Sequence, residues 1–138
     1  MNSYYADYNT GAAANRDPAH ADLTWISKYE TGEVQTQTKQ SFAYMKSHQL
    51  AFRGATPNPS VKVQSMLSPQ VVILTSCLLT DKSDPWVEYS TATGKAVPLG
   101  TPRKPPPPYL LRIFMKASSG STWQITSVLQ DTSKTCTG

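Results

Sequence analysis

The two cysteines are the residues of this sequence whose joint chemistry is easiest to predict. Cys77 ends the segment Val71–Cys77, which opens with an apolar run and reads as a strand, whereas Cys136 lies almost at the C-terminus in a polar stretch. Such a pair suggests a disulfide that pins the tail to the sheet. In the chain-entropy model this bond would add about 4 kcal/mol of stability, and it would persist only in an oxidising compartment. The alternative is a pair of unrelated buried thiols.

The histidines and glycines give little support to catalysis or metal binding. His20 and His48 fall at the ends of predicted helices, where a histidine more often serves the helix terminus than a reaction. Neither has a third partner at the spacing of a triad, and no cluster of cysteines or carboxylates beside them suggests zinc. The 7 glycines form no phosphate-binding loop. We therefore expect a non-enzymatic protein with no metal and no cofactor.

The segment from residue 95 to residue 116 has the composition of a binding surface. It carries several basic residues, a run of consecutive prolines and no acidic residue. Such a segment would suit an anionic partner or a proline-reading groove, but its aromatic residues are too sparse for specific nucleic-acid binding. The alternative is a stiff, solvated loop between two strands. The candidate binding residues are Lys95, Arg103, Lys104, Tyr109 and Arg112.

Length and charge fit one small exported domain. The 138 residues suffice for a single core, and only 16% of them are charged. The net charge of +4 favours anionic surfaces, although a mildly basic soluble protein without such a partner has the same composition. No stretch approaches the roughly 20 apolar residues of a membrane span, and no signal peptide follows Met1. If the disulfide forms, we expect a leader or lipid-anchor segment to have been removed.

Hydrophobic periodicity predicts helices in the first third of the chain and strands thereafter. Helices are expected at 2–14, from Asp17 (as N-cap) to about Tyr29, and from Val34 to Ser47. Strands are expected near 50–53, 61–65, 71–77, 86–89, 110–116 and 123–129, with 71–77 central. The inward residues should be Tyr5, Tyr8 and Ala12, then Leu23, Trp25 and Ile26, then Phe42 and Met45.

This order of elements predicts an α+β fold with N-terminal helices packed on one curved antiparallel sheet. We expect one domain over 1–138, with helices at about 2–47, the sheet at about 50–130 and a disulfide-pinned tail at 131–138. The crowded N-terminal aromatics should line the contact between the helices and the sheet.

Several loose motifs along nearly the whole chain also suggest a family. A Tyr-rich helix precedes Asn15-Arg16-Asp17-Pro18, and a cysteine follows the apolar strand at Leu74-Thr75-Ser76-Cys77-Leu78. The turn Thr93-Gly94-Lys95, the segment Arg103-Lys104-Pro105 and the late Trp123-Gln124-Ile125 complete the pattern. With these motifs the chain resembles the exported NTF2-like proteins of actinobacteria, whose cone-shaped fold is shared with nuclear transport factor 2 and ketosteroid isomerase. The chain departs from the family's acidic stretch after the cysteine, because its acidic residues come later, at Asp81 and Asp84.

The resemblance implies a pocket between helices and sheet, where isomerase-like members place a carboxylate base. A counterpart here would stand on an inward-facing strand position. Glu88 is the only acidic residue within a predicted strand, and ordinary surface alternation is its other explanation. The remaining aspartates fall on predicted helix surfaces, caps or loops: Asp7, Asp17, Asp22, Asp81, Asp84 and Asp131.

Members of this family mostly lack an assigned activity, so the resemblance implies an architecture more than a function. We expect an extracellular or cell-surface binding or assembly module at the cell envelope. Its partner would be a protein or an anionic envelope component, and one face of the sheet would suit a homodimer. The alternative is a small-molecule pocket protein or a weak isomerase-like enzyme. A closed, polar interior would argue against this alternative, whereas a roomy pocket with a buried carboxylate would favour it.

Overall fold

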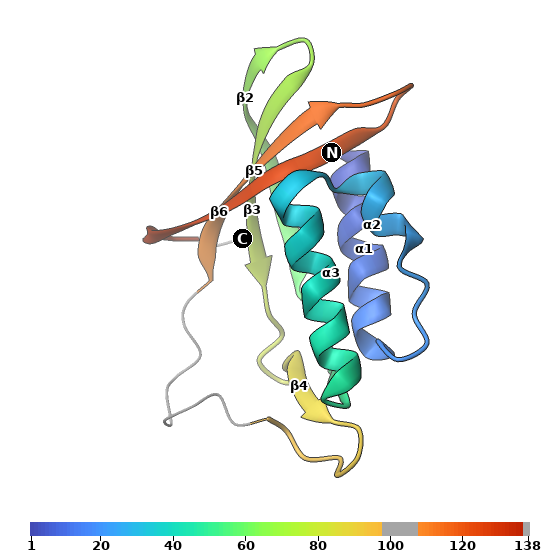
Figure 1. The fold of residues 1–138 in the computed structure, drawn as a ribbon. Coiled ribbons are helices and arrows are strands. Elements are labelled where there is room, and N and C mark those ends of the chain that lie inside the picture. The colour runs from blue at the N-terminus through green and yellow to red at the C-terminus, as the bar shows by residue number, and fades with distance from the viewer. Residues whose placement is uncertain (98–107, 137–138) are drawn as a thin grey trace.

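The computed structural model describes residues 1–97 and 108–136, and the chain in these ranges forms an α+β fold (Figure 1). Three helices come first: α1 (Asn2–Arg16), α2 (Thr24–Tyr29) and α3 (Gly32–Ser47). The strands follow: β1 (Leu50–Arg53), β2 (Asn58–Ser68), β3 (Val71–Leu79), β4 (Val87–Ser90), β5 (Tyr109–Ala117) and β6 (Trp123–Thr135). The predicted fold class is confirmed.

The strands form two antiparallel sheets where the sequence suggested one. The larger sheet has the order β2-β3-β5-β6, which confirms β3 as a central strand, and β1 pairs only with β4. The short sheet separates because the chain turns sharply out of β1 at Gly54, whose φ is +100°. Ala55 then donates its N–H to the carbonyl of Asp84 at 3.0 Å, in the loop that leads to β4.

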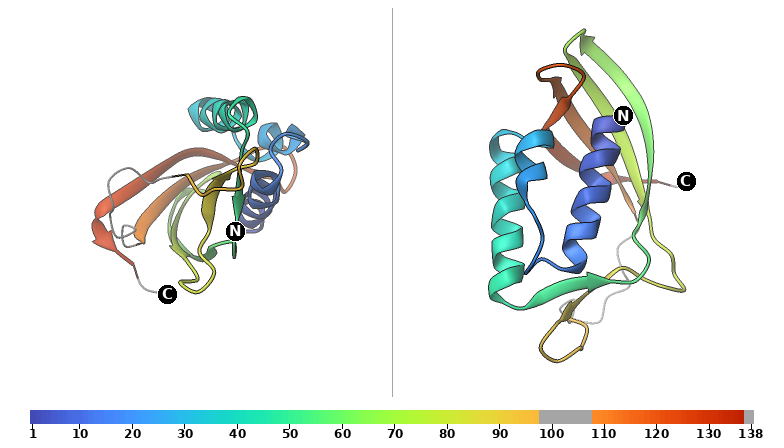
Figure 2. Two further views of the ribbon diagram at one scale, coloured as in Figure 1. Left: turned by 90° about the horizontal axis from the view of Figure 1, so that it is seen from below. Right: turned by 90° about the vertical axis from the view of Figure 1, so that its right-hand side faces the viewer.

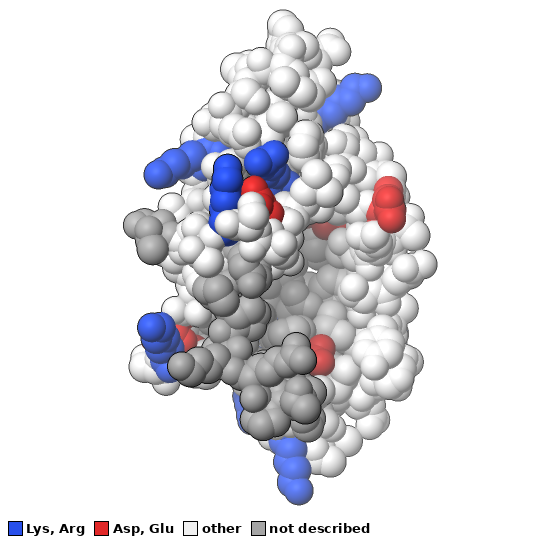
Figure 3. All heavy atoms as spheres, turned by 90° about the vertical axis from the view of Figure 1, so that its left-hand side faces the viewer, with Lys and Arg blue, Asp and Glu red and all other residues white. Residues whose placement is uncertain are grey.

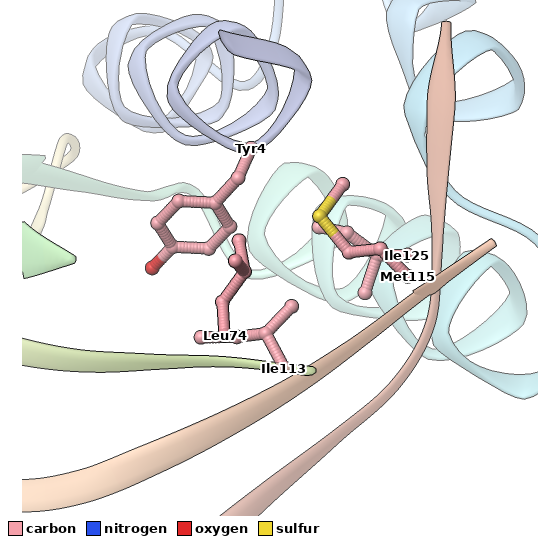
Figure 4. Close-up of a cluster of buried hydrophobic side chains, with 5 residues drawn as sticks. All are labelled: Tyr4, Leu74, Ile113, Met115 and Ile125. Atoms are coloured by element: carbon pink, nitrogen blue, oxygen red, sulfur yellow. The ribbon is translucent and has the colours of Figure 1, made fainter. Parts of the chain in front are cut away.

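The helices cover one face of the larger sheet (Figure 2). The main core lies between α1 and the sheet and consists of Tyr4, Leu74, Ile113, Met115 and Ile125. Figure 4 shows the Tyr4 side chain reaching from the helix toward these strand residues. A second core joins the helices to one another. It contains Ala14, Ile26, Phe42 and Met45, which confirms the inward positions predicted for α3.

The inward face of α1 differs from the prediction. Tyr4, Asp7 and Ala14 are buried, whereas Tyr5, Tyr8 and Ala12 are only half-buried. The Tyr4 hydroxyl donates to Ser76 Oγ on β3 at 3.1 Å, and Asp7 lies on the same inward face of the helix as Tyr4. An apolar pattern would not select a face that contains an aspartate.

Helix α2 begins later than predicted. Asp17 is the C-cap of α1, and its backbone N–H donates to the carbonyl of Ala14. The Asp22 carboxylate, by contrast, accepts the N–H of Thr24 at 2.9 Å, just where α2 starts. A later Asx contact therefore opens this helix, and the predicted helical start at Asp17 is wrong.

The predicted disulfide is present. Cys77, near the end of β3, is bonded to Cys136, with their Cα atoms 5.9 Å apart. The segment before Cys136 is not a separate tail, because β6 continues to Thr135 and pairs with β5 as far as Tyr109. The bond thus links the end of β6 to β3, the strand on the other side of β5. Within the described ranges, no helix has both the length and the apolarity needed to cross a membrane.

Candidate functional site

A cleft between the helices and the larger sheet is the candidate site. It has two adjoining spaces of about 290 Å³ and about 370 Å³. Both spaces are lined by Asp7, Tyr8, Glu30, Thr38 and Leu78, so these residues stand at their junction. The lining comes from α1, from the connection between α2 and α3, from α3 itself and from β3. The sheet and the helix layer therefore build the site together.

Asp7 is the first of two buried carboxyl groups at this junction. Its side chain comes from the inward face of α1, and the residue is only 8% exposed. Oδ1 has no hydrogen-bond partner among the described residues. Burial, with a smaller contribution from the charge of Glu30, raises the pKa of Asp7 to about 7. The group can therefore gain or lose a proton near neutral pH.

Glu30 is the second buried carboxyl group, and its backbone is fixed from several sides. Its N–H donates to the carbonyl of Ile26 at 2.8 Å, and its own carbonyl accepts the Gln35 amide at 3.2 Å. The next residue, Thr31, donates its N–H to Ile125 of β6 at 3.0 Å. This bridge to the sheet holds the Glu30 side chain in the cleft.

The surroundings of the Glu30 side chain disfavour its charge. Glu30 is 5% exposed, and Oε2 lacks a partner within the described part of the chain. Burial raises the pKa of the Glu30 carboxyl, and the hydroxyl of Thr38 partly opposes this rise. Two weakly solvated carboxyl groups therefore share one small space, which disfavours ionisation of both at once.

Aromatic side chains form the wall of the smaller space. Trp25 packs edge-on against Phe42 with ring centroids 6.1 Å apart, and Trp86 stacks on Phe52 at 5.4 Å. The indole N–H of Trp25 is buried and has no acceptor among the described residues. Tyr8 is engaged, because its hydroxyl donates to the carbonyl of Pro57 at 2.6 Å. The space thus offers one free donor beside two carboxyl groups.

Glu88 faces a wider groove of about 730 Å³ that continues from this cleft. The groove runs between α3 and the short sheet, and Glu88 lies on β4 opposite Phe52. The groove shares the lining residue Asn15 with the smaller space and Gln37 with the larger one. Figure 3 shows the molecule hollowed on one side, with acidic side chains beside the hollow. Glu88 therefore lines the groove and neither of the two spaces that meet at the junction.

The described members of the predicted basic surface come from different sheets. Lys95 is exposed after β4 of the short sheet, whereas Arg112 lies on β5 of the larger one. Arg112 forms an ion pair with Asp131, with Nη2 and Oδ2 3.3 Å apart. Asp131 lies within β6, so its predicted place in a loop is wrong. Arg103, Lys104 and the side chain of Tyr109 lie outside what the structure describes.

The histidines make local contacts near helix ends. The His20 ring contacts the exposed Asp17 carboxylate at 2.9 Å, in the turn after α1. His48 follows α3, where its ring stacks on Tyr44 with centroids 3.9 Å apart. Neither histidine lines the two spaces around Asp7 and Glu30.

Comparison with known proteins supports the fold alone. No protein-family model matches the sequence, and no curated protein matches it. Among solved structures, the intermembrane space region of the chloroplast protein ARC6 is similar, with a TM-score of 0.57, 13% identity, and coverage of 94% of this chain and 91% of that one. A de novo designed β-sheet protein aligns over 90% of this chain and 86% of its own, at 14% identity, but its TM-score of 0.35 supports no inference.

Sequence reasoning missed both carboxyl groups at the junction. Asp7 was assigned to a helix surface, and Glu30 was not considered. One signal was present for Asp7, because it lies three residues after Tyr4 and four before Gly11, the spacing of one helix face. Glu30 carried no comparable signal, since its burial depends on a bridge to Ile125, far along the chain.

Proposed function

We propose that this protein is a non-enzymatic, extracytoplasmic binding module that holds a small organic ligand in the cleft around Asp7 and Glu30. One observation carries the proposal: the buried atoms Asp7 Oδ1 and Glu30 Oε2 have no partner among the described residues, yet both residues line the same cleft. Buried polar groups in folded proteins are nearly always hydrogen-bonded. Because leaving them unpaired costs stability, a ligand that supplies partners would bind favourably.

The disulfide supports the proposed compartment. A bond between Cys77 and Cys136 persists in secreted and envelope proteins and is rare in the cytosol. A cell-envelope location and membership in the exported NTF2-like proteins are parts of the same proposal. The similar fold of the ARC6 intermembrane space region is compatible with them.

The cleft replaces the basic segment as the proposed binding surface. Arg112 is already engaged by Asp131, and Lys95 belongs to a different sheet. The space around Asp7 also matches the feature that favours a pocket protein, namely a buried carboxylate in a cavity.

An isomerase-like enzyme is the second candidate. The pKa of Asp7, raised to about 7 by burial, suits a group that accepts a proton at neutral pH. In such an enzyme Asp7 would take the role considered for Glu88.

The three tryptophans provide a direct test of ligand binding. Trp25 and Trp86 line the cleft, whereas Trp123 packs against the main core. We would label the protein with ¹⁵N, assign the indole N–H signals by Trp→Phe substitution, and screen a library of small organic fragments. Ligands of the cleft should shift the Trp25 and Trp86 signals and leave that of Trp123 unchanged.

A cleft-filling variant serves as the control. Ala12 is a half-buried lining residue of α1, so Ala12→Trp should fill the smaller space and abolish the shifts caused by the hits. If no fragment moves the Trp25 signal, or if Ala12→Trp leaves the shifts intact, the cleft is not a binding site. Turnover of a hit, lost in Asp7→Asn, would favour the enzyme instead.

A further inference from the structure

We infer that the ligand of this cleft is an organic cation, with an ammonium group placed near Asp7 and Glu30 and an apolar body against the aromatic wall. The inference rests on the proposed binding function and names the chemical class of its ligand. It follows from the charges that line the cleft, from the unpaired carboxyl oxygens and from the aromatic lining.

The lining of the cleft is acidic. Asp7 and Glu30 stand at the junction, and Glu88 lines the groove that continues from it. No lysine, arginine or histidine is among the described residues that line these three spaces. Charges of one sign on weakly polar walls concentrate their field in a cleft. That field attracts cations and repels anions.

Among the described residues, Arg16 lies at the rim of the cleft and is held there by other groups. The Arg16 guanidinium donates to the carbonyl of Gly54 at 2.7 Å and to Thr56 Oγ1 at 3.2 Å. It also lies over the Trp86 ring, 4.8 Å from its centroid. Arg16 makes no ion pair with either buried carboxyl group among the described contacts. Within the described part of the chain, no cation neutralises an ionised junction, and a cationic ligand would do so.

An ammonium group fits the two carboxyl groups at the junction. It can donate hydrogen bonds to the carboxylates of Asp7 and Glu30, the acidic residues that line both spaces, and hydrogen bonds between charged groups are the stronger kind. It also removes the repulsion between the two carboxylates when both are ionised. A neutral ligand would satisfy at most the hydrogen bonds.

The wall and the size of the cleft suit the apolar body of such a cation. Tyr8 and Trp25 line the smaller space, and aromatic rings attract an ammonium group. The two spaces of about 290 Å³ and 370 Å³ fit a small organic molecule.

The main competing ligand is a neutral carbonyl compound, and pH separates the two. A carbonyl oxygen would accept a hydrogen bond from protonated Asp7, so its binding should weaken as Asp7 ionises near pH 7. A cation should bind more tightly as Asp7 ionises. Among the described residues, the other titratable groups at the cleft are Glu30, Tyr4 and Tyr8, with Tyr44 and Glu88 in the groove and Arg16 at the rim. Burial raises the pKa of Tyr4 and of Tyr8, so these two groups stay neutral in this range.

The experiment compares probes that differ in charge at nearly constant shape. Cumylammonium, C6H5–C(CH3)2–NH3⁺, keeps its N–H donors and stays largely protonated over the pH range used, tert-butylbenzene is its neutral isostere, and acetophenone is a neutral carbonyl compound. Each is titrated against the Trp25 signal at about pH 5.5 and about pH 8.5. We expect the cation to bind at least about tenfold more tightly than tert-butylbenzene at the higher pH, and to weaken at the lower pH.

Isosteric variants identify the source of the preference. Asp7→Asn and Glu30→Gln should each reduce the affinity for cumylammonium by about tenfold and leave that for tert-butylbenzene nearly unchanged. Asp84→Asn, at an exposed loop position, should change neither affinity. Equal binding of cation and isostere, or tighter binding of acetophenone at low pH, would overturn the inference and leave the binding function intact. If neither the probes nor the fragment library move Trp25, the binding function itself fails.

Discussion

At the scale of single residues, Asp7 links the cleft to the stability of the protein. In the unfolded chain its pKa is near the ordinary aspartate value of about 3.9, whereas burial raises it to about 7 in the folded protein. Between these values the folded state binds more protons than the unfolded state. Stability must therefore fall as the pH rises from about 4 to about 7 and stay lower above that range. Keeping an ionised Asp7 buried therefore lowers the stability of the fold.

Removing the charge of Asp7 should stabilise the protein at high pH. We expect Asp7→Asn to raise the free energy of unfolding by about 1–3 kcal/mol at pH 8, because the neutral amide avoids most of the cost of burying a charge. Near pH 4 the gain should vanish, since Asp7 is protonated in the folded protein there. Urea denaturation at both pH values measures the difference.

Asp84→Asn is the matched control for this prediction. Asp84 is exposed, so its substitution should alter stability by less than about 0.5 kcal/mol at either pH. An Asp7→Asn variant that is no more stable than the wild type at pH 8 would show that burying the charge of Asp7 does not destabilise the protein.

At the scale of elements, the turn after β1 positions the aromatic wall. Gly54 has a φ of +100°, and a Cβ atom there would overlap the carbonyl oxygen of Pro85. This close approach places Trp86 next to Phe52 of β1, with which it stacks. The short sheet and the wall of the cleft thus depend on one glycine.

Gly54→Ala should destabilise the protein by about 3 kcal/mol or more, because it combines an unfavourable φ with an overlap against backbone. Gly94→Ala is the comparison: its φ is +71°, but nothing lies within 4 Å of the added Cβ. That variant should lose only about 1–2 kcal/mol. Thermal unfolding of both variants tests the difference, and equal losses would mean that the contact with Pro85 relaxes without cost.

At the scale of the whole molecule, the disulfide ties together strands that do not pair with each other. Cys77 lies near the end of β3, and Cys136 follows β6, while β5 lies between these strands in the sheet. The loop that the bond closes spans 59 residues and includes residues 98–107, which the structure does not describe. Reducing the bond frees this part of the chain in the unfolded state.

Replacing both cysteines by serine should therefore lower the free energy of unfolding by about 4 kcal/mol in the chain-entropy model. Urea denaturation of the oxidised protein and of the Cys77→Ser/Cys136→Ser variant measures the loss. Reductant should lower the stability of the wild type and leave the variant unchanged. Free thiols in the untreated monomer, counted by alkylation and intact mass, would contradict the bond.

Much of the element pattern was readable from the sequence. The apolar positions of α3, Phe42 and Met45, recur at helical spacing and are buried as predicted. The apolar run of β3 predicted a central strand, and its cysteine predicted the bond to Cys136. The helix and the strand could be predicted because each depends on residue types close together in the chain. The disulfide could be predicted because the chain has only two cysteines.

The candidate site was decided by the tertiary structure. The rotation of α1 depends on the contact between Tyr4 and Ser76, which are 72 residues apart, and the place of Glu30 depends on its bridge to Ile125. Local pattern assigns polar residues to the surface, because burying a charged group is normally unfavourable. The sequence by itself thus determined the fold class, α3, the central strand and the disulfide. Only the packing of helices against the sheet brought Asp7 and Glu30 into one cleft, because that packing is set by contacts between distant residues.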